Sequence, residues 1–230
     1  MRITDSGFII INKGDDYENI LDAIIESGYA EEFCLSNDFS PDFVADLMNA
    51  GFLVMSIAAE DEQGLFYILM PKHHLVRTVL FFDRLHIGRT ASRFMQRYEL
   101  KTDTDFELIV KRCVQKHGDD WLTPPLLESI YEIKKNNDAS VKPFSFGLYS
   151  QGELKAGEFG IVSGRVYTSY SGYYDESSAG RVQMIKTAQY LEAAGFDFWD
   201  LGMPLDYKFT LGAHNIGIKE FTELFRSAKH

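Results

Sequence analysis

The sequence predicts an α+β fold in which helices flank a mixed, mainly antiparallel sheet. Two observations carry this prediction. Several segments repeat apolar residues every three or four positions, as amphipathic helices do. Other short runs of β-branched and aromatic residues are bounded by turn-forming residues, as strands are. Hydrophobic residues make up 45% of the 230 residues, which is enough for a packed core. We expect a small N-terminal α/β domain at 1–83 and a larger domain at 84–230.

The first eighty residues predict two helices and a small antiparallel sheet. Residues 16–27 have helical apolar spacing, which Gly28 ends. Pro41 then begins a second helix. Two apolar runs at 52–59 and 64–70, separated by an acidic turn, predict a hairpin. A third strand is expected at 75–82.

The segment 88–98 predicts a helix that carries a stripe of arginines. Arg89, Arg93 and Arg97 are four residues apart and therefore line one face. One interpretation is an ordinary solvated face. The other is a local phosphate-binding track, since three arginines gather on one stripe in a chain of net charge -11. The overall negative charge argues against broad, nonspecific coating of nucleic acid.

The rest of the chain predicts helices and a meander of strands. Helices are expected at 104–116 and 123–135, the second begun by Thr123 before a proline. Strands follow from 143 to 174, with turns at 151–152 and 163–164. A helix at 177–194, a short strand within 196–203 and a closing helix at 218–228 complete the order.

Composition also limits the kind of site. Cys34 and Cys113 are too few for a disulfide framework and lack metal-ligand spacing, so buried structural thiols are expected. No stretch approaches the roughly 20 apolar residues of a membrane-spanning helix, and no signal peptide is recognisable. We expect a cytoplasmic protein that has no membrane partner and binds no metal.

Four blocks of sequence carry a resemblance to a known family. They are LHIGRTASRF, DWLTPPLLESIY, GELKAGEFGIVSGRVY and FDFWDLGMPLDYKFTLGAHNIGIKEF. In this order and at similar spacings they resemble the leucyl/phenylalanyl-tRNA–protein transferases, over about 40–230 and most strongly after residue 85. The order of meander, helix, short strand and helix is similar to the GNAT-type acyltransferase core.

The resemblance implies an activity and its partners. Such enzymes move an amino acid from the 3′ end of charged tRNA to the N-terminal amine of an acceptor protein, which marks that protein for degradation under the N-end rule. They use no metal and no acetyl-CoA, so no cofactor is expected.

The resemblance also implies site residues. Asp200 stands where the family has its Asp, and is expected to bind the acceptor's ammonium group as the catalytic residue. Trp121 matches the Trp that stacks on the terminal adenosine, although a Trp in such a loop is also often a core anchor. The arginine stripe falls on a surface similar to the one that meets tRNA. The other substrate-binding candidates are Glu158, Tyr167, Tyr170, Ser171 and Trp199.

The chain departs from the family at several of these positions. The family motif GESMFS reads SYSGYY at 169–174, so its Glu becomes Tyr170 and its pocket Met becomes Gly172. The family Gln two residues beyond the Asp is Gly202. These changes remove polar groups from a site whose chemistry depends on fixed donors and acceptors.

One further departure concerns donor specificity. Glu158 stands where the family has a Met in its apolar aminoacyl slot. A buried carboxylate must be paired or suffer a large desolvation cost. Either Glu158 pairs with a base such as Arg165 or Arg181, or it receives a cationic aminoacyl side chain.

Three functions follow from these observations. The first is an active aminoacyl-tRNA–protein transferase with altered specificity. The second is a catalytically weakened paralogue that acts as a binding protein. The third, a GNAT enzyme that uses acyl-CoA, is disfavoured because SSAGRV offers a single glycine for a pyrophosphate cradle. A catalytic role predicts that Asp200→Ala abolishes transfer and leaves the melting temperature nearly unchanged.

Overall fold

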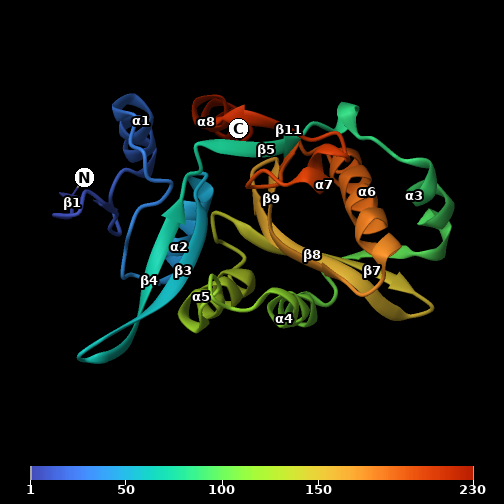
Figure 1. The fold of residues 1–230 in the computed structure, drawn as a ribbon, viewed down its shortest axis with the longest axis horizontal. Coiled ribbons are helices and arrows are strands. Elements are labelled where there is room, and N and C mark those ends of the chain that lie inside the picture. The colour runs from blue at the N-terminus through green and yellow to red at the C-terminus, as the bar shows by residue number, and fades with distance from the viewer. Residues whose placement is uncertain (1, 230) are drawn as a thin grey trace. The chain divides into compact units, whose positions relative to one another are not determined.

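The computed structural model of the chain describes residues 2–229 (Figure 1). It shows two compact units, each assembled from segments far apart in sequence. Unit 1 contains the chain up to Leu75, together with Asp119–Lys142 and Gly217–Ser227. Unit 2 contains Val76–Gly118, Pro143–Ile216 and the chain from Ala228 onward. The domain boundary between residues 83 and 84 stays a prediction.

Unit 1 combines helices with two small two-stranded sheets. Its helices are α1 (Tyr17–Ser27), α2 (Pro41–Asn49), α5 (Pro124–Lys135) and α8 (Ile218–Ser227), and its strands are β1 (Arg2–Ile3), β2 (Ile9–Ile10), β3 (Leu53–Asp61) and β4 (Gly64–Lys72).

Local signals explain the elements of unit 1. Asp16 caps α1 by accepting the backbone N–H of Asn19, and Gly28 ends the helix in the left-handed conformation. The strands β3 and β4 pair in continuous antiparallel register. The two predicted helices and the predicted hairpin are therefore confirmed.

Unit 2 is built on a seven-stranded sheet, with the strand order β11-β5-β10-β9-β8-β7-β6. The strands are β5 (Val76–Leu80), β6 (Glu99–Thr102), β7 (Lys142–Ser150), β8 (Glu153–Ser163), β9 (Val166–Tyr174), β10 (Phe198–Asp200) and β11 (His214–Gly217). The helices are α3 (Arg89–Phe94), α4 (Phe106–His117), α6 (Ser177–Ala193) and α7 (Asp206–Phe209). The strand β10 runs parallel to β9 and antiparallel to β5. The predicted fold class is therefore confirmed.

One strand lies in a different sheet from the one expected. The run at 75–82 forms β5, which pairs with β10 rather than with the hairpin of unit 1. Both strands are short and largely buried, with Leu80 opposite Trp199. Their pairing buries apolar side chains from segments some 120 residues apart, which local periodicity cannot reveal. The elements β6, α7 and β11 were not predicted either.

Helices cover both faces of the central strands of unit 2. Figure 1 shows α4 and α6 on opposite sides of β8. On the α4 face, the rings of Phe106 and Phe159 lie 6.0 Å apart, edge to face. On the α6 face, Val182 and Ile185 share a core with Tyr167. The strand β8 is accordingly buried from Ala156 to Ile161, which makes both faces of the sheet candidates for a site.

The two cysteines behave as structural thiols. Cys34 and Cys113 are both reduced and buried. Burial raises the pKa of each thiol from 9.0 to about 12, so neither is a thiolate at neutral pH.

Candidate functional site

The short strand β10 places Trp199 and Asp200 in the middle of the sheet of unit 2. Asp200 is in register with Thr168 of β9, and all three residues of β10 are buried. Because side chains alternate along a strand, Trp199 and Asp200 point to opposite faces. The predicted site residues of unit 2 are therefore divided between two faces.

Asp200 accepts a set of buried hydrogen bonds. Its Oδ1 accepts from Nε of Arg77 at 3.2 Å and from the backbone N–H of Gly202 at 2.9 Å. Its Oδ2 accepts from Oγ1 of Thr168 at 3.0 Å and from Nη2 of Arg77. A carboxylate offers about four lone-pair positions, and these bonds occupy them. Asp200 is 0% exposed and Arg77 is 1% exposed, so the two form a buried, hydrogen-bonded ion pair.

This arrangement bears on the catalytic role predicted for Asp200. An acceptor ammonium can reach the carboxylate only if one of the present donors leaves it. The hydroxyl of Thr168 can turn away most readily, because it rotates on its side chain, whereas the neutral N–H of Gly202 is fixed in the backbone and Arg77 is a charged donor. Arg77 and Thr168 were missed in the sequence. The signal for Arg77 was a lone charge inside the apolar strand VRTVL, which requires a buried partner.

Three predicted site residues and a neighbouring serine lie together on the α6 face of the sheet. The indole Nε1 of Trp199 donates to Oγ of Ser169 at 2.8 Å, and that hydroxyl donates to Oε2 of Glu158 at 3.4 Å. Tyr167 is fully buried, with its ring centroid 6.2 Å from that of Trp199. Its hydroxyl has no hydrogen-bond partner among residues 2–229. The structure thus brings Glu158, Tyr167 and Trp199 together, on the face away from Asp200.

Glu158 is a buried acid. Burial raises the pKa of its carboxyl from 4.5 to about 8, and the polar side chains of Gln183 and Ser169 offset only part of this cost. The carboxyl is therefore mostly protonated at neutral pH and can donate one hydrogen bond. Glu158 thus places a polar group inside the apolar α6 face of the sheet.

The expected basic partners of Glu158 are engaged elsewhere. Arg165 forms two hydrogen bonds of 2.9 Å with Asp197. Arg181 donates to Oγ1 of Thr210 at 2.6 Å and to the carbonyl of the same residue. The prediction that Glu158 pairs with Arg165 or Arg181 is wrong. The reason is that each arginine has nearer acceptors: Arg165 binds the carboxylate of Asp197, and Arg181 binds the hydroxyl and the carbonyl of Thr210.

Tyr170 and Ser171 belong to the α4 face. A β-bulge between Phe159 and Gly160 shifts the register of β8 against β9, so that Phe159 lies opposite Ser171. The rings of Phe159 and Tyr170 are 6.2 Å apart. The hydroxyl of Ser171 interacts with the thiol of Cys113 in α4 and moderates the raised pKa of that thiol. Both candidates therefore lie on the same side of the sheet as Asp200.

Lys208 is a buried cation that the sequence analysis missed. Its Nζ donates to the carbonyl of Leu201 and, at 2.7 Å, to that of Met203. Burial lowers the pKa of its amine to about 8, although the nearby charge of Asp200 opposes that shift. Lys208 thus closes the turn that follows Asp200.

The three arginines of the stripe are exposed, but the helix that carries them is shorter than expected. Arg89 and Arg93 lie in α3, whereas 95–97 form a 3-10 turn that carries Arg97. The guanidinium of Arg97 stacks over Phe94, 4.6 Å from the ring centroid. All three arginines face solvent. Their role in binding tRNA stays a prediction.

Trp121 belongs to unit 1, where its loop is fixed by Ser56 of β3. The backbone N–H of Ser56 donates to the carbonyl of Trp121 at 2.9 Å, and Oγ of Ser56 accepts the N–H of Thr123 at 3.0 Å. The indole is half-buried. Stacking on adenosine stays a prediction for this residue.

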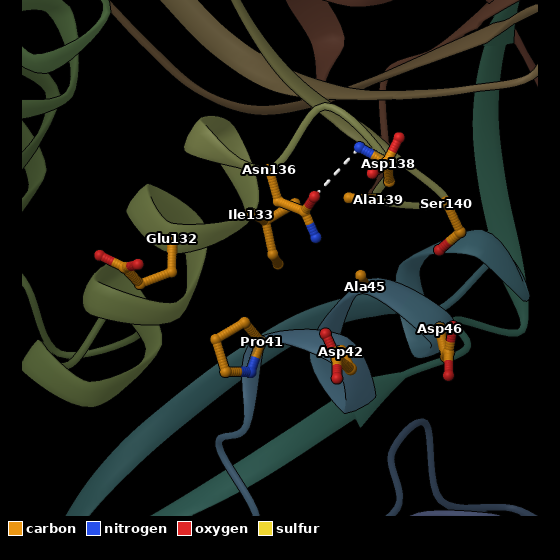
Figure 2. A pocket seen from close by; sticks show the side chains of 10 residues that line it. All are labelled: Pro41, Asp42, Ala45, Asp46, Glu132, Ile133, Asn136, Asp138, Ala139 and Ser140. Carbon is orange, nitrogen blue, oxygen red and sulfur yellow. Dashed lines mark hydrogen bonds between the residues drawn. The ribbon is translucent and has the colours of Figure 1, made fainter.

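A pocket of about 390 Å³ also lies in unit 1. Figure 2 shows α2, which carries Asp42 and Asp46, facing Glu132 and Asn136 of the α5 region across it. None of the predicted site residues is among those that line it. Within the described part of the chain, no cluster of three acidic, His or Cys side chains is arranged to hold a metal ion. None of the helices described for residues 2–229 has the length and apolar character of a membrane span.

Comparison with solved structures finds weak similarity of fold. FemX aligns with a TM-score of 0.45 at 10% identity, covering 91% of this chain and 80% of its own. A GCN5-related N-acetyltransferase from Anabaena variabilis aligns with a TM-score of 0.42 at 8% identity, covering 88% and 49%.

Comparison of sequences identifies a family and several named relatives. Residues 79–226 match the family model described as leucyl/phenylalanyl-tRNA protein transferase. The leucyl/phenylalanyl-tRNA–protein transferase of Pseudomonas fluorescens is 30% identical over 152 residues, which are 64% of this chain and 66% of that protein. The Campylobacter jejuni protein of the same name is 27% identical over 65% of this chain and 67% of its own length. The family match spans most of the chain, including the whole sheet around Asp200 except its first few residues. The chain belongs to the leucyl/phenylalanyl-tRNA protein transferase family.

Proposed function

We propose that the chain is an aminoacyl-tRNA–protein transferase, which joins an amino acid from charged tRNA to the N-terminal amine of an acceptor protein. The observation that carries the proposal is the family match over 79–226, which includes β10 and its terminal Asp200. The match covers 66% of the Pseudomonas fluorescens protein, so the activity is inferred from shared sequence rather than from a full-length counterpart. We further propose that the tagged acceptors are degraded and that the reaction takes place in the cytoplasm.

The reaction is aminolysis of an ester. The acceptor nitrogen must be neutral to attack, the tetrahedral oxyanion needs donors, and the ribose oxygen leaves with a proton. In the proposal, Asp200 orients the acceptor amine when the hydroxyl of Thr168 turns away from it. Arg77 stays bound to Asp200 and holds the carboxylate in its buried position.

The turn after Asp200 supports this arrangement without the family's Gln. Gly202 has a φ of 74°, in the left-handed region that favours glycine, and its N–H donates to Asp200. A side chain at this position would strain the turn. Orientation of the amine therefore falls to Asp200 and its buried partners.

Glu158 is proposed to determine donor specificity. Neither Arg165 nor Arg181 pairs with it, and its Oε1 has no hydrogen-bond partner among residues 2–229, although Lys208 lies near enough to lower the pKa of the carboxyl. In the proposal, this oxygen receives a guest with a polar or cationic side chain. A cationic guest would favour ionisation of the carboxyl and repay part of the cost of burying it. We propose an arginyl or lysyl donor in preference to the leucyl or phenylalanyl group of the family name.

A binding protein without catalysis is the second candidate. It is favoured by the hydrogen bonds of Asp200, whose four lone-pair positions are filled in this structure. Under this alternative the carboxylate holds the turn together and touches no substrate.

Transfer from individually charged tRNAs tests the proposal. Arginyl-, lysyl-, leucyl- and phenylalanyl-tRNA, each labelled in the amino acid, are incubated with the chain and a peptide with a free N-terminal amine. The proposal predicts incorporation from the cationic donors, and Glu158→Gln should lower that incorporation. Activity with leucyl or phenylalanyl donors alone would remove the specificity proposal. Absence of incorporation from every donor, together with thermal stabilisation by an aminoacyl-adenosine mimic, would favour the binding protein.

A further inference from the structure

The buried amine of Lys208 is bonded to the turn that directly follows Asp200. Lys208 lies in α7 and is 5% exposed. Its Nζ donates to the carbonyl of Leu201 and, at 2.7 Å, to the carbonyl of Met203. Burial of an ammonium group is costly unless its N–H groups find acceptors. These two carbonyls therefore hold the lysine, and the lysine in turn holds the backbone around Gly202.

The strand β5 fixes the same turn through its backbone. The N–H of Thr78 donates to the carbonyl of Gly202 at 2.7 Å, and the N–H of Leu201 donates to the carbonyl of Thr78 at 2.9 Å. The three successive carbonyls from Leu201 to Met203 therefore each accept a hydrogen bond, the outer two from Lys208 and the middle one from β5. A buried polar network is rigid when its members are paired in this way.

One peptide unit connects Lys208 to the carboxylate of Asp200. The carbonyl of Leu201 and the N–H of Gly202 belong to the same peptide bond, which is planar. Lys208 binds the carbonyl end of this unit, and the N–H end donates to Oδ1 of Asp200 at 2.9 Å. The plane of the peptide decides where its N–H points. Lys208 therefore acts on Asp200 through the 201–202 peptide.

We propose that Lys208 is a positioning residue for transfer, which keeps the N–H of the 201–202 peptide on Asp200 while the hydroxyl of Thr168 gives way to the acceptor amine. This inference rests on the proposed function. The carboxylate must keep its orientation during this exchange, because misplacing a reacting group by about 1 Å can cost a hundredfold in rate. The bonds to Oδ1 from Arg77 and Gly202 supply that orientation.

The charge of Lys208 serves the same end. Burial lowers the pKa of its amine to about 8, while the nearby carboxylate of Asp200 opposes that shift. The amine is therefore mostly protonated at neutral pH. An ammonium that donates to the carbonyl of a peptide polarises that peptide and makes its N–H a stronger donor. Lys208 thus both orients and strengthens the hydrogen bond from Gly202 to Asp200.

An apolar side chain at this position would separate packing from positioning. Methionine is unbranched and has no N–H group, so K208M removes both hydrogen bonds of the lysine and keeps much of its packing. A purely structural role predicts that K208M loses stability and keeps its rate per folded molecule. The positioning role predicts that its kcat falls as well.

Hydrogen exchange of the Gly202 amide, followed by NMR, tests the hold on the peptide without any substrate. In K208M this amide should exchange about tenfold faster than in wild type, because its peptide loses the hydrogen bond from Lys208. K208R should exchange like wild type, since a guanidinium can donate to both carbonyls. The control Ile24→Val changes the core of unit 1, where Ile24 is 1% exposed, and should leave this exchange unchanged.

Transfer kinetics measure the consequence for the reaction. K208M should lower kcat by about tenfold or more and leave the KM values of charged tRNA and acceptor peptide within about twofold, because Lys208 acts on the reactants only through Asp200. K208R should keep most of the wild-type kcat. A loss that followed stability alone would also appear in Ile24→Val. If K208M does not fold, K208Q replaces it in both measurements.

The exchange rate and kcat must change together. Faster exchange of the Gly202 amide in K208M with an unchanged kcat would overturn the positioning role and leave the proposed function standing. So would a lower kcat with unchanged exchange, or an equal loss of kcat in K208R when its exchange is that of wild type. A wild-type chain that transfers nothing would overturn the proposed function itself, whatever the exchange rates.

Discussion

The carboxylate of Asp200 and the guanidinium of Arg77 lie out of contact with water, with 0% and 1% of each side chain exposed. Two charges in such surroundings stabilise the fold only as a pair, because each alone would suffer an uncompensated desolvation cost. Sequence alone predicted that removing this carboxylate would leave the melting temperature nearly unchanged. The buried pair reverses that expectation.

Asp200→Asn should therefore destabilise the protein as well as lower transfer. Neutralising one partner leaves Arg77 buried without its counter-charge, at a cost of about 3–5 kcal/mol in the free energy of unfolding. Urea denaturation measures this difference. The double variant R77M/D200L removes both charges and should lose less stability than D200N. A melting temperature for D200N equal to that of wild type would contradict the account of the pair.

Glu158 should make stability depend on pH. In the unfolded chain its carboxyl loses its proton near pH 4.5, whereas in the folded chain it keeps the proton up to about pH 8. Between these values the folded state binds one more proton than the unfolded state, so rising pH favours unfolding, by up to about 1.4 kcal/mol per pH unit. The stabilisation is fully present below pH 4.5 and is lost as the pH approaches 8.

The isosteric variant Glu158→Gln isolates this effect. It cannot release a proton, so its free energy of unfolding should fall less than that of wild type between mildly acidic and mildly alkaline pH. Urea titrations at the two ends of the window give the comparison. Parallel pH profiles for the two proteins would show that the carboxyl is ionised in the folded state and would remove the case for a neutral acid.

At the scale of elements, tRNA binding is predicted for α3 and the 3-10 turn that follows it. Arg89, Arg93 and Arg97 are exposed there, although the turn at 95–97 breaks the regular helical spacing. If they contact phosphates, each contact releases counterions and adds to the salt dependence of binding.

The triple variant R89A/R93A/R97A should weaken binding of charged tRNA and reduce the slope of log affinity against log salt by about two to three. Filter binding over a range of salt concentrations measures both. The variant K111A/R112A/K116A removes three exposed cations from α4 and serves as the matched control. Equal slopes for the two variants would mean that α3 is an ordinary solvated helix.

Elements defined by local pattern were predicted well, and those defined by distant pairing were not. The spacing of apolar residues was sufficient to predict the helix that forms α6, and the four residues that carry this spacing, Val182, Ile185, Ala188 and Leu191, are all buried. The placement of β5 depends on β10, far along the chain, and no local signal reports such a partner. The same holds for β6 and β11, which are short edge strands.

The candidate site shows the same limit. Resemblance to the family placed six residues in one substrate-binding group. The structure brings three of them together, Glu158, Tyr167 and Trp199. Tyr170 and Ser171 lie on the other face of the sheet, and Trp121 belongs to unit 1.

The resemblance could not show that Asp200 points to the other face of the sheet. The face to which a strand side chain points can be assigned only when the register of the strand is known. Nor could the resemblance find the partner of Asp200, since Arg77 precedes it by 123 residues.

At the scale of the whole molecule, we propose that this chain moves an amino acid from tRNA to a protein N-terminus. Family membership and the strand that carries Asp200 support it. Under this proposal, we expect the departures at Gly202 and Glu158 to change rate and specificity rather than the class of reaction.

Mass spectrometry of an acceptor peptide incubated with the chain and total charged tRNA tests this proposal. We expect the peptide to gain one amino acid at its N-terminus, and only when the tRNA is charged. An N-acetylated copy of the peptide should gain nothing. A peptide of unchanged mass, with a free amine and with every charged tRNA present, would contradict it.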